Sequence, residues 1–304
     1  KSVGTIVAIS SYASYFWQPI MNLGNIFNNF INNIAYLERI FETMDEPVTV
    51  KDAKDAVEMP KIRGEVTFDH VNFSYDASKQ ILNDVSFTVK PGESVALVGP
   101  TGAGKSTIVN LISRFYNVNG GRVLIDGQDI SQVTIHSLRE QMGIMMQDSF
   151  IFSGDIEDNI RYGKLDATHE EIVKASRTVC ADEFISKMPD RYQTEVRERG
   201  SMLSQGQKQL ISFARTLLSD PAILILDEAT SSVDTRTEIE IQKAMDNLMK
   251  GRTSFVIAHR LSTIKDADLI LVMKDGDIIE QGNHKELLAA NGFYADLYNS
   301  QFDK

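Results

Sequence analysis

The first 37 residues form a helical pattern that carries no charge after Lys1. From Ser2 to Leu37 the chain has no Asp, Glu, Lys, Arg or His. Its polar side chains recur at steps of three and four, which places them along one face of a helix. This polar stripe consists of Ser11, Ser14, Gln18, Asn22, Asn25, Asn29 and Asn32. Apolar residues fill the other side: Phe16, Ile20, Leu23, Phe27, Phe30, Ile31 and Ile34.

Such a run predicts a long helix that crosses a membrane and extends into the cytosol. At ~1.5 Å per residue it would span about 54 Å, against a hydrocarbon core of ~30 Å. Pro19 should kink it or leave carbonyl groups free. A cleaved signal peptide would be much shorter, and a buried helix of a soluble protein is the other alternative. Amide side chains are costly against lipid, so the stripe should face other helices or a wet cavity.

The composition changes at Glu38, and Glu46-Pro47 should end the helix, because a residue before proline is pushed toward extended geometry. We therefore expect residues 1–46 to be a transmembrane helix with a cytosolic extension and residues 47–61 to be a linker. A single domain of residues 62–304 would follow. The chain begins with Lys1, so we expect either a processed start or a piece of a longer protein.

A strand, a glycine loop and a helix follow one another near residue 100. Apolar and polar residues alternate from Val66 to Tyr75, which predicts β structure, and the apolar run 95–98 predicts a second strand. That run enters a loop that matches the phosphate-binding pattern GxxxxGK[ST]: Gly99, Pro100, Thr101, Gly102, Ala103, Gly104, Lys105, Ser106 and Thr107. In this context, backbone N–H groups converge on phosphate oxygens. We expect Lys105 to reach the β- and γ-phosphates and Ser106 to bind Mg²⁺.

A second buried strand, residues 222–226, ends in two carboxylates, Asp227 and Glu228. Two adjacent carboxylates at the end of a buried strand cost free energy unless they bind a cation or a water molecule. Asp227 is the expected partner of Mg²⁺, and Glu228 could polarise the attacking water. A pair of strand-end caps is the alternative.

Lys105 and Asp227 are 122 residues apart (227 − 105), so something is inserted between them. Residues 168–218 have a mainly helical pattern. Within them, Ser204 and Gln207 form the S-x-x-Q pattern of a capping box at the start of a helix. The same helix N-terminus could be presented to an anion.

Net charge and cysteine content exclude further classes of protein. The chain has 304 residues, with 31 basic and 42 acidic side chains, giving a net charge of −11 that argues against a nucleic-acid binder. The single cysteine, Cys180, excludes an intrachain disulfide and a Cys-based zinc site, which fits a reducing compartment.

Taken together, these motifs resemble the ATP-binding half of an ABC exporter of the multidrug- or lipid-exporting half-transporter type. Gly99–Thr107 matches the Walker A loop and Ile223–Glu228 the Walker B strand. Leu203–Gln207 is similar to the LSGGQ signature, with Gln205 where glycine is usual. The remaining matches are Gln147 (Q-loop), Ser231–Asp234 (D-loop), His259 (H-loop) and Tyr75, which stands where the family stacks an aromatic ring on adenine.

The resemblance implies an α/β P-loop NTPase fold: a RecA-like core, an antiparallel β subdomain and an inserted helical subdomain at about 148–218, preceded by the last transmembrane helix. It implies ATP hydrolysis coupled to export, with ATP and Mg²⁺ as cofactors. Gln147 would touch Mg²⁺ and link to the membrane part, and His259 would contact the γ-phosphate.

In this family two ATP-binding domains pair head to tail. Ser204, Gly206, Gln207 and Asp234 would then serve the nucleotide of the partner, a second half-transporter identical to this chain or different from it. The protein would lie in the cell membrane, in contact with lipid and with transmembrane helices that this chain lacks, and its ATP-binding domain would be cytoplasmic.

Two other classes stay open. A soluble ABC-type ATPase of DNA repair or translation usually carries coiled coils, zinc cysteines or two cassettes, and none of these is present in the sequence. A P-loop kinase would not need the inserted signature or the Asp227-Glu228 pair.

Overall fold

The chain folds into two units. The computed structural model describes residues 2–76, 78–145, 150–197, 200–227, 235–257 and 264–302. The first unit is Lys1–Thr49 and the second is Val50–Lys304. The sequence places a linker at 47–61, whereas most of that segment belongs to the second unit.

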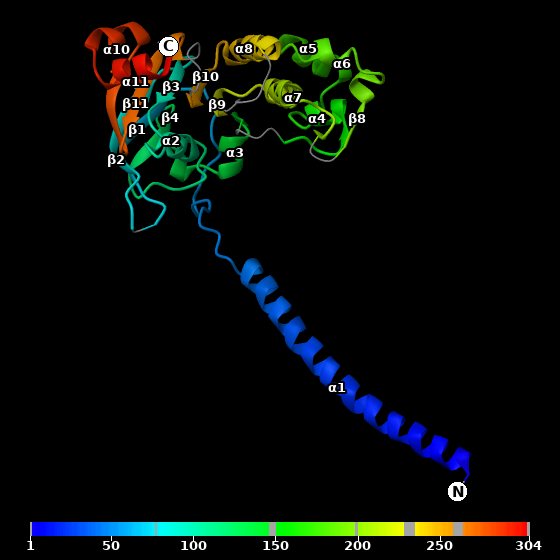
Figure 1. The fold of residues 1–304 in the computed structure, drawn as a ribbon. Coiled ribbons are helices and arrows are strands. Elements are labelled where there is room, and N and C mark those ends of the chain that lie inside the picture. Colours follow the sequence, from blue (N-terminus) through cyan, green and yellow to red (C-terminus); the bar gives the residue numbers. More distant parts are fainter. Residues whose placement is uncertain are drawn as a thin grey trace. The chain divides into compact units, whose positions relative to one another are not determined.

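The first unit is a single helix, α1 (Val3–Met44), of 42 residues (Figure 1). It continues through Pro19 and ends just before Glu46-Pro47, as the sequence predicts. By length and hydropathy, no helix in the part of the chain that the structure describes could cross a membrane.

The second unit is built on a six-stranded sheet with the order β12-β11-β3-β10-β9-β6. The strands from β11 to β6 run parallel, and β12 pairs antiparallel with β11. Their bounds are β3 Ser94–Val98, β6 Met142–Met145, β9 Ile223–Asp227, β10 Thr253–Ile257, β11 Leu269–Lys274 and β12 Asp277–Gly282.

Both faces of this sheet are buried, which explains why its parallel strands read as continuous apolar runs. Along β9, Ile223 and Ile225 join the core on the side of α2 (Lys105–Ile112). Leu224 and Leu226 point the other way, into the core that includes α7 (Gln205–Leu218) and α8 (Thr235–Met249). Figure 1 shows α2 and α8 on opposite sides of the strands.

A separate antiparallel sheet, β2-β1-β4-β5, covers the face that carries α2. Its strands are β1 Val66–Phe73, β2 Leu82–Val89, β4 Gly120–Ile125 and β5 Gln128–Asp129. Val66 pairs with Val89 and Phe68 with Phe87, and the Phe68 and Phe87 rings stack at 4.6 Å. The alternating pattern in the sequence therefore predicts β1 correctly.

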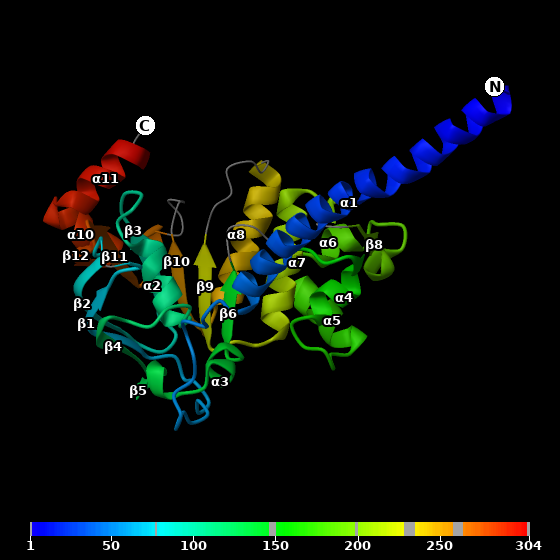
Figure 2. The same ribbon diagram turned by 90° about the horizontal axis from the view of Figure 1, so that it is seen from below.

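A helical subdomain occupies one side of the central sheet (Figure 2). It contains α4 Ile156–Arg161, α5 His169–Thr178, α6 Asp182–Ile185, the 3₁₀ turn Arg191–Gln193, α7 and the short pair β7 Gly154–Asp155 and β8 Glu195–Val196. The 3₁₀ turn Ile130–Gln132 and α3 Ile135–Arg139 precede β6, and α10 His284–Ala290 and α11 Phe293–Phe302 close the chain. The expected α/β core, antiparallel subdomain and helical subdomain are all present.

Candidate nucleotide-binding site

The glycine loop 99–104 joins the end of β3 to the start of α2. Gly104 has φ +104° and occupies the N-cap of α2 without a side-chain hydrogen bond to the helix. Gly99 has φ +149°, and a Cβ there would lie 2.2 Å from the carbonyl oxygen of Met273. Both positions therefore need glycine. The loop leaves the N-terminal turn of α2 capped by backbone alone, which is the arrangement that binds phosphate.

A cavity of about 370 Å³ opens beside this turn. Its size is within the range of small-molecule sites. It is lined by Tyr75, Lys79, Ile81, Thr101, Gly102, Gly104, Lys105, Ser106, Thr107, Asp227 and Ile257. β3, β10 and β9 are parallel neighbours, so their carboxyl ends meet at one edge and bring Asp227 to the loop. Gly99, Pro100 and Ala103 shape the loop but do not line the cavity.

Lys105 bends back over its own loop. Its Nζ donates to the carbonyl oxygens of Gly99 at 2.7 Å and Pro100 at 2.9 Å. Burial lowers the pKa of Lys105, and the nearby Asp227 carboxylate opposes that shift. Charged acceptors such as phosphate make stronger bonds to an ammonium group than neutral carbonyls do. The side chain is therefore placed to serve a phosphate in this cavity.

Ser106 and Asp227 supply a hydroxyl and a carboxylate to the same cavity. Hard oxygen donors of this kind suit Mg²⁺, which in proteins typically takes one or two carboxylates and otherwise waters and phosphate oxygens. The donor set thus fits the expected metal. Gln147, the third expected Mg²⁺ contact, lies outside the described residues.

Tyr75 stands at the mouth of the cavity, with 48% of its surface exposed. Its ring meets Phe73 and Tyr116 edge-on, each at 4.9 Å between centroids. Its hydroxyl shares a hydrogen bond with Thr107 Oγ1 at 3.2 Å, and Asn110 donates to it at 3.5 Å. An exposed aromatic ring beside a phosphate loop is suited to stack on a flat base.

Two residues of the cavity wall, Lys79 and Ile81, were not predicted from the sequence. They lie between β1 and β2 and belong to no motif. The only signal that could have found them is their place in the turn that follows Tyr75.

The signature segment begins α7 as the sequence predicts. Ser204 is the N-cap and its hydroxyl accepts from the Gln207 backbone N–H at 3.2 Å, while Gln207 Oε1 accepts from the Ser204 N–H at 3.0 Å. This confirms the capping box. Gly206 is buried in the first turn. Ser204, Gly206 and Gln207 do not line the cavity beside Lys105.

Three further expected site residues, Glu228, Asp234 and His259, lie outside the described residues. Glu228 follows the last residue of β9, and His259 comes two positions after the end of β10.

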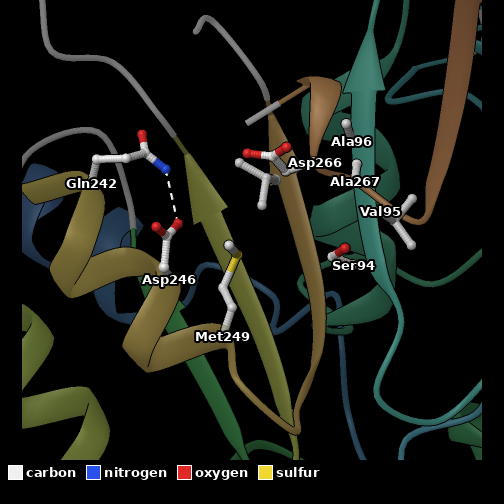
Figure 3. Close-up of a pocket in the computed structure, with 9 residues that line it drawn as sticks. Ser94, Val95, Ala96, Gln242, Asp246, Met249, Asp266 and Ala267 are labelled. Carbon is white, nitrogen blue, oxygen red and sulfur yellow. Dashed lines mark hydrogen bonds between the residues drawn. The ribbon is translucent and has the colours of Figure 1, made fainter. Parts of the chain in front are cut away.

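A smaller cavity, of about 30 Å³, lies between α8 and the central sheet (Figure 3). Gln242 donates to Asp246 at its rim, at 3.0 Å. The cavity has room for about one water molecule. It includes none of the residues that the sequence assigns to a site.

Known proteins resemble this chain in sequence and in fold. The family model "ABC transporter" matches residues 82–231. An uncharacterized ABC transporter ATP-binding protein, YknV of Bacillus subtilis, is 53% identical over 99% of this chain and 50% of its own length. A fatty acid ABC transporter ATP-binding/permease protein of Mycobacterium bovis is 48% identical over 97% of this chain and 47% of its own length. The chain therefore spans about half the length of the curated relatives it matches.

A solved structure agrees with the sequence comparison. It is a bacterial Atm1-family ABC exporter with ATP bound, which is 43% identical and has a TM-score of 0.81 over 99% of this chain and 53% of its own. The matched region contains the glycine loop, the signature and the Asp227 strand in the order that the resemblance requires. The chain belongs to the ABC transporter family and carries its ATP-binding ATPase domain.

Proposed function

We propose that this chain is the ATP-hydrolysing part of an exporter half-transporter. The observation that carries the proposal is the single cavity that gathers Lys105, Ser106 and Asp227 at the start of α2. The relatives named as exporters and permeases, and the likeness to an ATP-bound exporter, support the same function.

The chain's own groups would each do one task in this cavity. Lys105 holds the β- and γ-phosphates, and the backbone N–H groups of the loop stabilise charge as it spreads over the transferred phosphoryl group. Glu228 polarises the attacking water, and His259 contacts the γ-phosphate. Tyr75 stacks on the adenine. When bound by Ser106, Asp227 and Gln147, Mg²⁺ supplies positive charge to the phosphate oxygens.

The site would be completed by a second ATP-binding domain. Ser204, Gly206, Gln207 and Asp234 serve the partner's nucleotide in this proposal. The absence of Ser204, Gly206 and Gln207 from the wall of the chain's own cavity supports it. ATP then favours the closed pair, and hydrolysis releases it. The partner is a second half-transporter. The full-length protein lies in a cell membrane, where α1 leads into a membrane domain whose other helices cover its polar stripe.

Phosphate release by the full-length protein in lipid vesicles tests the proposal. Wild type should release phosphate from Mg-ATP without phosphorylating an acceptor, which separates it from a kinase. Glu228→Gln keeps the shape of the side chain but removes its charge, so hydrolysis should fall at least ~10²-fold, as expected for loss of a general base.

The matched control is Glu183→Gln, an exposed carboxylate on α6. It should leave the rate unchanged. Turnover of the Glu228→Gln protein at the wild-type rate would show that this carboxylate has no part in the reaction.

A further inference from the structure

The segment 50–62, which we call the strap, joins α1 along the chain to the first strand of the second unit. It has hardly any regular structure, yet it is firmly held. Val57 pairs with Val133 as a short parallel bridge, with hydrogen bonds of 3.1 Å to Gln132 and 2.9 Å from Thr134. Met59 and Ile62 are 6% and 4% exposed and belong to the core on the side of α2. The strap is therefore fixed to the rest of the second unit by hydrogen bonds and buried side chains.

Arg114 fastens the beginning of the strap. It follows the C-terminal end of α2, and its side chain is only 2% exposed, against 43% for that of Asp52. Its guanidinium donates to the carbonyl oxygens of Lys51, at 3.1 Å, and Val133, and lies 3.8 Å from the Asp52 carboxylate. Burial lowers the pKa of Arg114, and Asp52 opposes that shift. A buried cation that loses such partners is strongly destabilising, so these bonds hold the strap in place.

Side chains around α3 fasten the rest of the strap. The Ser137 hydroxyl accepts from the Met59 N–H and the Gln141 side chain accepts from the Ile62 N–H, both at 2.8 Å. Asp52 accepts from the Ile135 N–H at 2.8 Å and so caps α3. Arg139 of α3 donates to the carbonyl oxygens of Ser113 and Arg114 at 3.0 and 2.8 Å, which ties α3 to the end of α2.

These contacts place the strap and the phosphate loop at opposite ends of one short helix. α2 runs from Lys105 to Ile112, and its 8 residues make it about 12 Å long at ~1.5 Å per residue. We propose that ATP binding at the first turn of α2 makes opening of the strap, which is held next to the last turn of α2, rarer. Arg114 is the positioning residue that couples the two ends. This inference rests on the proposed function, because it requires a nucleotide in the cavity beside Lys105.

The physical basis is linkage. An anion at a helix N-terminus stabilises the helix, so nucleotide should make opening of α2 and its attachments rarer. Opening of the strap requires the Arg114 bonds to break. If the two events are coupled, ATP must lower the equilibrium constant for strap opening by the same factor by which a closed strap raises ATP affinity.

Hydrogen exchange measures strap opening directly. In the full-length protein, the amides of Val57, Met59 and Ile62 should exchange about fivefold or more slowly when a nonhydrolysable ATP analogue and Mg²⁺ are present. Arg114→Gln should speed their exchange and remove most of this response. Arg114→Lys, which keeps the charge but has fewer donors, should fall between the two.

Asp52→Asn serves as a milder variant should Arg114→Gln fail to fold. It keeps an oxygen for the Ile135 N–H but removes the charge beside Arg114, so the same effects should appear in weaker form. The matched control is Arg177→Gln, which breaks an ion pair of 3.1 Å with Asp182 in the helical subdomain, where the Arg177 side chain is 70% exposed. It should change neither the exchange of the strap amides nor the binding of the analogue.

The outcomes separate the two proposals. A wild-type protein that does not bind the analogue contradicts the proposed function and the strap inference together. A wild-type protein that binds it while strap exchange stays the same overturns the strap inference alone. An Arg114→Gln protein whose strap amides still exchange about fivefold more slowly with the analogue bound would overturn it too, because Arg114 would then not couple the two sites.

Discussion

At the scale of single residues, the site depends on a few polar groups whose positions are set by their neighbours. The Lys105 ammonium group is held 2.7 and 2.9 Å from two carbonyls of its own loop. The Tyr75 ring is held between two other rings, and its hydroxyl meets Thr107. Each group is thus positioned by contacts that a nucleotide would partly replace.

Lys105→Ala should weaken ATP binding and lower turnover. Losing a charged hydrogen bond costs ~1.5–3 kcal/mol, so affinity should fall about 10- to 100-fold. Direct titration of the full-length protein with ATP measures this. Lys90→Ala is the control, since the Lys90 side chain is 79% exposed and lies outside the cavity. Equal affinities of wild type and Lys105→Ala would remove Lys105 from the site.

Tyr75→Ala should have a smaller effect. Stacking of a base on an aromatic ring is worth ~1–3 kcal/mol, and Tyr75→Phe should keep most of it because the ring remains. The same titration compares the three proteins. If Tyr75→Phe binds ATP as weakly as Tyr75→Ala, the hydroxyl and its bond to Thr107 matter, and the ring does not stack on adenine.

At the scale of elements, two helix N-termini are built in opposite ways. α2 has a glycine N-cap with no side-chain bond, while α7 has a capping box in which Ser204 and Gln207 satisfy each other's backbone N–H. The first therefore suits a phosphate of the chain's own nucleotide. The second is capped by its own side chains, so it is stable without a bound anion.

Ser204→Ala should destabilise the ATP-binding unit by about 1 kcal/mol, because it removes the N-cap of α7. Ser204→Asp keeps a cap and should stay within a few tenths of a kcal/mol of wild type. Urea unfolding monitored by circular dichroism compares them. Identical midpoints for wild type and Ser204→Ala would mean that the capping box contributes no stability.

At the scale of the whole molecule, the order of the elements could be read from the sequence, because strand, glycine loop and helix succeed one another locally. The long helix, the buried strand before Asp227 and the capped helix at Ser204 have local signals of the same kind. The strap could not be predicted, since its attachment depends on Arg114 and Gln141, which are 63 and 79 residues from their partners Lys51 and Ile62. Its sequence is charged and has little periodicity, which is typical of a linker that contacts nothing.

The membrane crossing that the uncharged run of residues 2–37 predicts stays a prediction. Lys79 and Ile81 were missed because cavity walls are made by chain segments that meet only in the fold.

The central claim is that this chain hydrolyses ATP only as one half of a pair with shared sites. Full-length Ser204→Arg and Lys105→Ala proteins should each be nearly inactive. In the first, bulk and charge keep each composite site that position 204 completes from closing on ATP, and in the second, phosphate binding is lost. Mixed before reconstitution into vesicles, they should form pairs in which one composite site carries both changes and the other carries neither. With random pairing, phosphate release should recover to about one quarter of the wild-type rate, since about half the pairs are mixed and each has one intact site. A mixture no more active than the average of the two separate proteins, or a Ser204→Arg protein with wild-type activity, would contradict the shared-site account.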